Sequence, residues 1–298
     1  MTNGENIYKN LKEKYGIKSI LFCPYKEEMF DSMETVYEAA IRDAEVEVGI
    51  MAIPYFTLWQ LIPVGLKQEF NGIGFPFALN QRWDVIIFHY PYDTKNTITR
   101  PLITSGVMKC FCSKLVYIPY YLTDDIGFGE NVASQPGVVS SDLVIVSNDR
   151  QKDVLERHFM KHNVDAEVVA WGSPKEDKRE VEIPESWIQK KDGRKVVLLQ
   201  TSVIPYLNNI NKLKQIEEFI DSTEDCIIWR PHPLYEDTIK SMRPFELGKF
   251  YMLKEKVDIL DDTQDYRTAF EFCDEMVSDG SSIDTLFIKT QKPFKHLN

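Results

Sequence analysis

The fold of this chain is indicated most clearly by one short stretch, Cys226-Ile227-Ile228-Trp229-Arg230-Pro231-His232-Pro233-Leu234. Its apolar run, residues 226–229, predicts a buried strand of a parallel sheet. The two prolines push the residues before them into extended conformations, so that Arg230 and His232 leave the sheet in a stiff frame. Open α/β sheets bind ligands at this carboxyl edge. The stretch therefore predicts a ligand site, with a simple surface turn as the alternative.

Strands and helices alternate on both sides of this stretch. Apolar runs predict strands at residues 19–23, 46–53, 84–88, 114–118, 142–146 and 166–170, and later at 195–200, 226–229, 257–260 and 275–277. The connections are too long for hairpins, which is typical of doubly wound parallel sheets. We therefore predict an α/β chain with two Rossmann-like domains facing each other across a cleft. We expect domains at residues 1–172 and 195–298, joined by a charged linker at 173–194.

Composition limits the classes of function. The formal charge is −11, from 46 acidic against 35 basic residues, which argues against general nucleic-acid binding. An odd number of cysteines, 5, and no Asn-x-Ser/Thr sequon favour a reducing, cytoplasmic location. No apolar run approaches the ~20 residues that span a bilayer, so we expect any membrane contact to be peripheral, at the inner face.

The sequence predicts neither a metal site nor a redox cofactor. Cys110 and Cys112 have no second Cys or His pair nearby, so we interpret them as packing residues. No Gly-x-Gly-x-x-Gly motif follows the first strand, and no Walker A sequence is present. We therefore expect no bound cofactor and no metal.

A serine-rich turn is the second informative stretch, Ser278-Asp279-Gly280-Ser281-Ser282-Ile283-Asp284. It lies between a short predicted strand and a predicted helix, where hydroxyls and free amides bind phosphate without a metal. An ordinary helix cap is the alternative. Thr201 and Ser202 hold the equivalent place after strand 195–200, again with loop capping as the alternative. The candidate phosphate ligands are Arg230, Thr201, Ser202, Asp279, Ser281 and Ser282.

His89 follows predicted strand 84–88, so we expect its imidazole to face the cleft as an acid or base. The alternative is a histidine satisfied by hydrogen bonds at a strand end. His158 and His162 share one helix face, but without a third ligand nearby we interpret them as surface residues.

These motifs resemble a known family. Arg230-Pro231-His232-Pro233, followed by the serine turn, resembles the paired motifs of the CDP-glycerol glycerophosphotransferases, which include teichoic-acid primases and polymerases. Residues 24–26, 89–93 and 172–175 are similar to one branch of that family, so the resemblance covers most of the chain. It implies a GT-B fold and transfer of a polyol phosphate from a CDP-alditol. The implied acceptor is a polyol-phosphate, glycan or lipid-linked hydroxyl in cell-wall polymer synthesis.

The resemblance also implies residue roles. His232 would act near the pyrophosphate with Arg230 beside it, and Ser281 and Ser282 would hold phosphate. We expect the first-domain loops to receive the acceptor, with His89 as the base and with Tyr25, Lys26 and Asp93 around it.

Two differences from the family leave other functions open. The strand end at residues 116–120 carries no histidine where the family has His-Gly-Thr, and Gly280 stands where the family has tyrosine. One alternative is a non-catalytic nucleotide- or phosphate-binding module. The other is a metal-independent GT-B glycosyltransferase that uses a nucleotide sugar. The sequence ends at Asn298, soon after the last predicted helix, so we expect either a fragment or a shortened second domain. The donor, the acceptor and the oligomeric state stay open.

Overall fold

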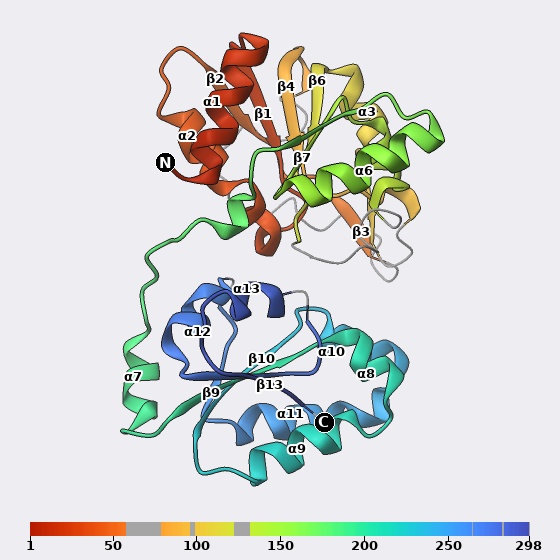
Figure 1. Cartoon of the computed structure of the whole chain (residues 1–298). Coiled ribbons are helices and arrows are strands. Elements are labelled where there is room, and N and C mark those ends of the chain that lie inside the picture. The colour runs from red at the N-terminus through yellow and green to blue at the C-terminus, as the bar shows by residue number, and fades with distance from the viewer. Residues whose placement is uncertain (58–78, 96–98, 122–131, 264, 282, 298) are drawn as a thin grey trace. The chain divides into compact units, whose positions relative to one another are not determined.

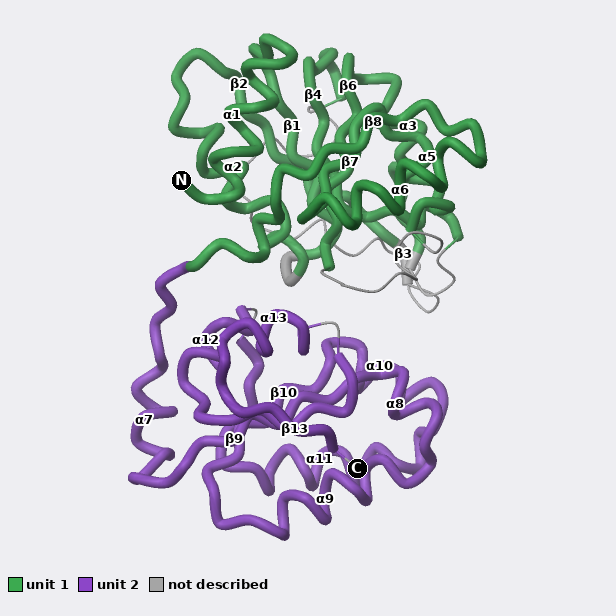
Figure 2. Tube along the Cα trace, viewed as in Figure 1, with its two compact units in different colours: residues 1–178 green, residues 179–298 purple. Residues whose placement is uncertain are grey.

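In a computed structural model, the chain divides into two compact units, unit 1 at Met1–Lys178 and unit 2 at Arg179–Asn298 (Figure 2). The structure describes residues 1–57, 79–95, 99–121, 132–263, 265–281 and 283–297. Each unit is an α/β structure built on a parallel sheet, as the alternating pattern predicts (Figure 1).

Unit 1 has a parallel sheet in the order β2-β1-β4-β6-β7-β8. The strands are β1 (Ser19–Cys23), β2 (Glu47–Ile50), β4 (Trp83–Phe88), β6 (Cys112–Tyr117), β7 (Leu143–Val146) and β8 (Glu167–Ala170). The helices are α1 (Asn3–Tyr15), α2 (Glu34–Ile41), α3 (Ser105–Cys110), α5 (Pro136–Ser140) and α6 (Asp149–His162). Short 3-10 turns cover Glu27–Ser32, Asp93–Lys95 and Pro174–Glu176, and β3 (Tyr55–Thr57) pairs antiparallel with β5 (Thr99–Pro101).

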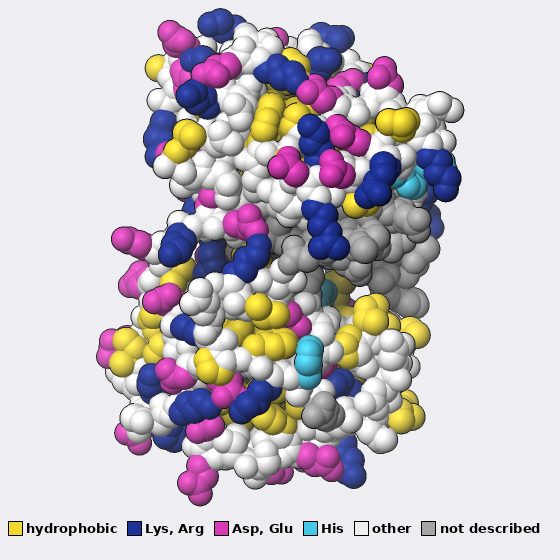
Figure 3. Space-filling view, viewed as in Figure 1, with side chains coloured by type: hydrophobic (Ala, Val, Ile, Leu, Met, Phe, Trp, Pro, Cys, Tyr) yellow, Lys and Arg dark blue, Asp and Glu magenta, His cyan; other side chains and the backbone are white. Residues whose placement is uncertain are grey.

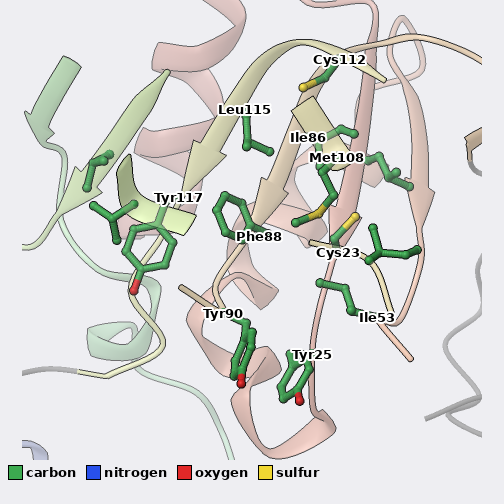
Figure 4. Close-up of a cluster of buried hydrophobic side chains, with 14 of the residues drawn as sticks. Cys23, Tyr25, Ile53, Ile86, Phe88, Tyr90, Met108, Cys112, Leu115 and Tyr117 are labelled. Carbon is green, nitrogen blue, oxygen red and sulfur yellow. The ribbon is translucent and has the colours of Figure 1, made fainter. Parts of the chain in front are cut away.

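The unit 1 sheet is buried on both faces, which explains its continuous apolar strands. Alternate residues of β1 belong to two clusters: Leu21 packs with one and Phe22 with the other. Figure 4 shows the first of these clusters, in which Leu115 and Ile86 lie among the strands and helix residue Met108 packs against them.

Unit 2 has a parallel sheet in the order β11-β10-β9-β12-β13. Its strands are β9 (Val196–Thr201), β10 (Cys226–Pro231), β11 (Ile259–Leu260), β12 (Glu275–Ser278) and β13 (Phe294–His296). Its helices are α7 (Glu185–Lys191), α8 (Val203–Asn208), α9 (Lys212–Asp221), α10 (Tyr235–Met242), α11 (Leu247–Lys256), α12 (Tyr266–Phe272) and α13 (Asp284–Ile288), with a 3-10 turn at Pro244–Glu246. Edge strand β13 was not predicted, because its short sequence is mostly polar and exposed.

The segment predicted as a linker, residues 173–194, packs onto the units at both ends. Asp177 accepts hydrogen bonds from the Asn3 and Gly4 amides at 2.7 and 3.0 Å, which holds the segment against the start of α1. At the other end, buried Trp187 packs on Phe272 with ring centroids 5.9 Å apart. The division between the units falls inside this segment, after Lys178.

Charged side chains of both signs are interspersed on the visible face of each unit (Figure 3). Several form ion pairs on helix surfaces, such as Lys240 with Glu236 at 2.7 Å and Lys249 with Glu217 at 2.8 Å. Ion pairs at the surface contribute about 0–1 kcal/mol each when they are solvent-exposed, so a pair such as Lys240 with Glu236 adds little to the stability of the fold.

Candidate functional site

The order of strands in unit 2 reverses between β9 and β12, which are hydrogen-bonded neighbours. Ligands of open α/β sheets bind at the carboxyl ends of the strands beside such a reversal. The loops at this point carry Ser202 after β9, His232 after β10 and the serine turn after β12. The structure therefore brings the predicted motifs of unit 2 to one edge of one sheet.

His232 is held by its own turn. Its backbone N–H donates to the Thr201 carbonyl at 2.9 Å, which extends the ladder between β10 and β9 by one residue. Its Nδ1 accepts a hydrogen bond from the Leu234 amide at 3.1 Å. An Nδ1 that accepts leaves the neutral ring with its proton on Nε2, so Nε2 is a hydrogen-bond donor. The ring is half-buried at the edge of the sheet.

Arg230 is engaged inside unit 2. Its Nη1 donates to the Asp261 carboxylate at 2.6 Å and to the Thr263 carbonyl at 3.0 Å. The Asp261 side chain is 0% exposed, and that of Arg230 is 12% exposed. The guanidinium thus fastens the end of β10 to the loop after β11. The predicted role of Arg230 at a phosphate stays a prediction.

Asp279 also has a different position from the one predicted. One carboxylate oxygen accepts from the Ser202 amide at 2.8 Å, and the other lies 3.6 Å from the Lys212 Nζ, too far for a hydrogen bond. The two side chains are 0% and 6% exposed. Burial raises the pKa of Asp279 to about 6, and the nearby Lys212 cation opposes that rise. Asp279 therefore ties the loop after β9 to the loop after β12. Its second carboxylate oxygen is buried and has no hydrogen-bond partner among the described residues.

Thr201 is likewise a structural residue. It is 0% exposed, and its hydroxyl accepts from the Trp229 indole N–H at 3.0 Å. Its neighbour Ser202 is half-buried at the start of the following loop. The predicted pair thus separates, because only Ser202 reaches the edge of the sheet.

The serine turn is closed by Asp284, which ends the predicted stretch but had no role assigned to it. The Asp284 carboxylate accepts from the Ser278 hydroxyl at 2.8 Å and from the Ser281 amide at 3.0 Å. Burial raises the pKa of Asp284. Gly280 has a φ of 104°, a conformation that favours glycine and accounts for the absence of a side chain there. Ser281 is half-buried beside the turn, whereas the predicted ligand Ser282 lies outside the described residues.

Gln200 was missed as well. It lies between Arg230 and Ser278 in the register of the sheet and is 3% exposed. Its Oε1 is buried and has no hydrogen-bond partner among the described residues. A buried acceptor of this kind is costly, and it marks the strand reversal as a place where a polar ligand would be favoured. The sequence feature that could have identified Gln200 is a polar residue near the end of an otherwise apolar strand.

His89 in unit 1 is fully buried, at 0% exposure. Its Nε2 accepts from the Tyr25 amide at 2.8 Å, and its Nδ1 lies 2.8 Å from the Ser32 hydroxyl. Burial, reinforced by the Lys175 charge, lowers its pKa to about 3. The expectation that this imidazole is presented to a ligand is wrong, because both of its nitrogens hold the loop between β1 and α2.

Of the other predicted residues of unit 1, Tyr25 and Asp93 are buried and Lys26 is half-buried. Tyr25 is 1% exposed and stacks on Tyr90 with centroids 3.7 Å apart. Asp93, at 7% exposure, accepts from the Ser105 amide at 2.9 Å and from its hydroxyl at 2.6 Å, and so anchors the start of α3. Lys26 is half-buried, with its Nζ 5.4 Å from the centre of the Tyr55 ring.

Across the described ranges, no three His, Cys, Asp or Glu side chains group so that they could hold a metal ion. No helix in those ranges is long and apolar enough to cross a membrane.

The chain matches no family model and no curated protein. It is similar to solved structures at low identity. UDP-GlcNAc 2-epimerase from Methanocaldococcus jannaschii, in complex with UDP-GlcNAc and UDP, is 12% identical, with a TM-score of 0.59 over 94% of this chain and 83% of that one. The S. aureus MnaA–UDP structure is 12% identical, with a TM-score of 0.59 over 93% and 79%. The Neisseria meningitidis epimerase bound to UDP-GlcNAc is 13% identical, with a TM-score of 0.55 over 89% and 78%.

These similarities concern the fold. They support the GT-B part of the predicted resemblance and do not extend to the CDP-glycerol glycerophosphotransferase family. With two Rossmann-like units on parallel sheets, the chain has a GT-B-type α/β fold.

Proposed function

We propose that this chain is a GT-B enzyme that acts on a nucleotide-activated sugar, which it binds through unit 2. The observation that carries the proposal is the set of loops at the strand reversal, tied together by the bonds from Ser202 to Asp279 and from His232 to Thr201. Proteins of similar fold are UDP-sugar enzymes by description, which supports a nucleotide-activated substrate.

The residues at this edge have distinct roles in the proposal. His232 points a donor, Nε2–H, from a ring whose other nitrogen is fixed by the Leu234 amide. It would donate to the diphosphate as negative charge develops on the leaving group, and such a donor lowers a barrier by about 3 kcal/mol. The hydroxyls of Ser202 and Ser281 would bind phosphate oxygens. Arg230 and Asp279 act indirectly, because they hold the loops that carry these groups.

Calorimetry tests the proposal. UDP, UDP-GlcNAc, GDP-sugars, CDP and CDP-glycerol are titrated into the full chain, alongside an assay for nucleotide release. We expect saturable binding of a UDP compound that is weakened in His232→Asn. Asparagine can accept from the amide two residues on, as the histidine does, so this variant keeps the turn and removes the part of the ring that carries Nε2. Failure of every nucleotide to bind would refute the proposal.

Transfer from a CDP-alditol is the second candidate. It is favoured by the placement of Arg230-Pro231-His232-Pro233 and the serine turn at one sheet edge, in the order of the family that they resemble. Preference for CDP-glycerol over UDP compounds, with release of CMP, would select this candidate. Binding without release of any nucleotide, across all acceptors tried, would select the non-catalytic module.

A further inference from the structure

Tyrosine hydroxyls gather at the carboxyl edge of the unit 1 sheet, after neighbouring strands β4 and β6. Tyr117 ends β6, Tyr120 and Tyr121 follow it, and Tyr92 follows β4. The hydroxyls of Tyr92 and Tyr120 lie 3.1 Å apart and share a hydrogen bond. The rings of Tyr120 and Tyr121 meet edge to face with centroids 4.9 Å apart. We call these four residues the tyrosine cluster.

Tyr117 differs from the rest of the cluster in its burial. The residue is 0% exposed, and its hydroxyl has no hydrogen-bond partner among the described residues. Figure 4 shows the Tyr117 ring at the end of the apolar cluster away from Cys112, with its oxygen pointing away from Leu115. A buried hydroxyl without a partner is costly, and a ligand that supplies the missing bond would remove that cost.

The chemistry of the cluster selects an uncharged ligand. Burial raises the pKa of Tyr117, and the neighbouring Tyr121, Tyr120 and Tyr92 add to the effect. Burial also raises the pKa of Tyr120 and Tyr121. Tyrosine hydroxyls are protonated near neutral pH even at their ordinary pKa of about 10, so the cluster carries no charge of its own. Each can donate one hydrogen bond and accept others, and each ring offers an apolar face. Hydroxyl groups on a carbon frame match both features.

We propose that the tyrosine cluster binds an uncharged, hydroxyl-rich ligand, a sugar or a linear polyol, and that Tyr117 hydrogen-bonds to it. The inference rests on the proposed function only in taking this ligand as the acceptor of the transfer. Half-buried Tyr92, Tyr120 and Tyr121 form the side of the cluster toward solvent, and Tyr117 forms its floor. The ring faces pack on the carbon frame of the ligand while the hydroxyls bind its oxygens.

Ligand-observed NMR titration of the full chain without nucleotide tests this directly. The probes are glycerol, ribitol and N-acetylglucosamine, with glycerol 3-phosphate as the charged counterpart of glycerol. For the neutral probe that binds best, we expect Tyr117→Phe to weaken binding about fivefold, the effect of one neutral hydrogen bond. We expect no loss of thermal stability in this variant, because the deleted hydroxyl had no partner.

Tyr235→Phe is the matched control. Tyr235 in unit 2 is also 0% exposed, and its hydroxyl also lacks a hydrogen-bond partner among the described residues. It should bind the probes as the parent does. The proposal is overturned if no neutral probe binds, if Tyr117→Phe and Tyr235→Phe bind equally, or if glycerol 3-phosphate binds more tightly than glycerol. Titration with UDP and CDP is scored separately, so failure of nucleotide binding in unit 2 stays distinct from failure of this site.

Discussion

His89 and His232 each follow directly after a parallel strand, His89 after β4 in unit 1 and His232 after β10 in unit 2. His89 is 0% exposed and uses both ring nitrogens to hold a loop. His232 is half-buried and uses Nδ1 to hold its own turn. The difference teaches that a histidine at a strand end is buried completely or in part according to the chain that covers it.

The two units can also be compared through a buried lysine–aspartate pair, which each of them has. Lys175 lies 2.6 Å from Asp31 in unit 1, with 7% and 9% of the side chains exposed. Lys212 lies 3.6 Å from Asp279 in unit 2, with 6% and 0% exposed. Lys175 acts on the pKa of His89, and Lys212 lies beside Asp279, which holds the loop that follows β9. Substitutions of the two lysines therefore test the surroundings of both histidines.

Removing the buried cations should have the largest effect. Lys175→Met and Lys212→Met each leave a carboxylate buried without its partner, which costs about 3–5 kcal/mol. We expect the smaller loss for Lys212→Met, because its pair is longer. Chemical unfolding measures both variants. Lys240→Met, which breaks an exposed pair with Glu236, is the control and should cost about 0–1 kcal/mol. Equal losses in all three variants would refute the role of the buried pairs.

The second-largest effect should be on turnover, which we expect to depend on His232 and not on His89. His232→Asn keeps the turn but removes Nε2, so we expect turnover to fall about a hundredfold, the effect of one oriented donor. His89→Gln should lower stability while the folded protein keeps turnover within a few-fold of the parent. Steady-state assays with the best donor measure both variants at a temperature where each is folded. The contrast between the histidines is lost if His89→Gln is the more damaging to turnover.

The pH dependence of stability should report His89. Its pKa falls from the ordinary 6.5 to about 3 in the folded protein. The neutral ring is therefore favoured by folding, so its contribution is complete above pH 6.5 and is lost as the pH falls toward 3. The slope reaches up to about 1.4 kcal/mol per pH unit.

Unfolding of the parent and of His89→Gln between these pH values isolates this contribution, because the carboxylates titrate in both proteins. We expect a shallower loss of stability in the variant. Parallel curves for the two proteins would mean that His89 accepts a proton in the folded state as easily as in the unfolded one.

The smallest effect should come from the turn that accompanies His232. Gly280→Ala places a side chain at a φ of 104° with no atom within 4 Å of the new Cβ, so only backbone strain opposes it. We expect a loss of about 1–2 kcal/mol. Gly248→Ala, in α11 and equally open, should instead gain about 0.5–1 kcal/mol. Thermal unfolding compares the two, and a stabilised Gly280→Ala would contradict the strained turn.

The local pattern of the sequence determined the strands and most helices, because apolar runs bounded by proline and glycine report burial directly. It therefore predicted two Rossmann-like α/β units and the β10 edge with His232, whereas the GT-B fold was implied by the family resemblance. It could not predict β13, whose three residues, Phe294–His296, form a strand only by pairing with β12. The sequence predicted a linker at residues 173–194, and the two units divide after Lys178.

What each polar side chain does was decided only by tertiary structure. Arg230 meets Asp261 across 31 positions, Ser202 meets Asp279 across 77, and His89 meets the Tyr25 amide across 64. A sequence pattern shows which residue ends a strand, but hydrogen-bond partners so far apart along the chain are set by the order of the strands. Arg230, Asp279 and His89 thus became anchors inside the units, and His232 holds its own turn through Nδ1. Burial and partners, rather than residue identity, fix the state of a polar group.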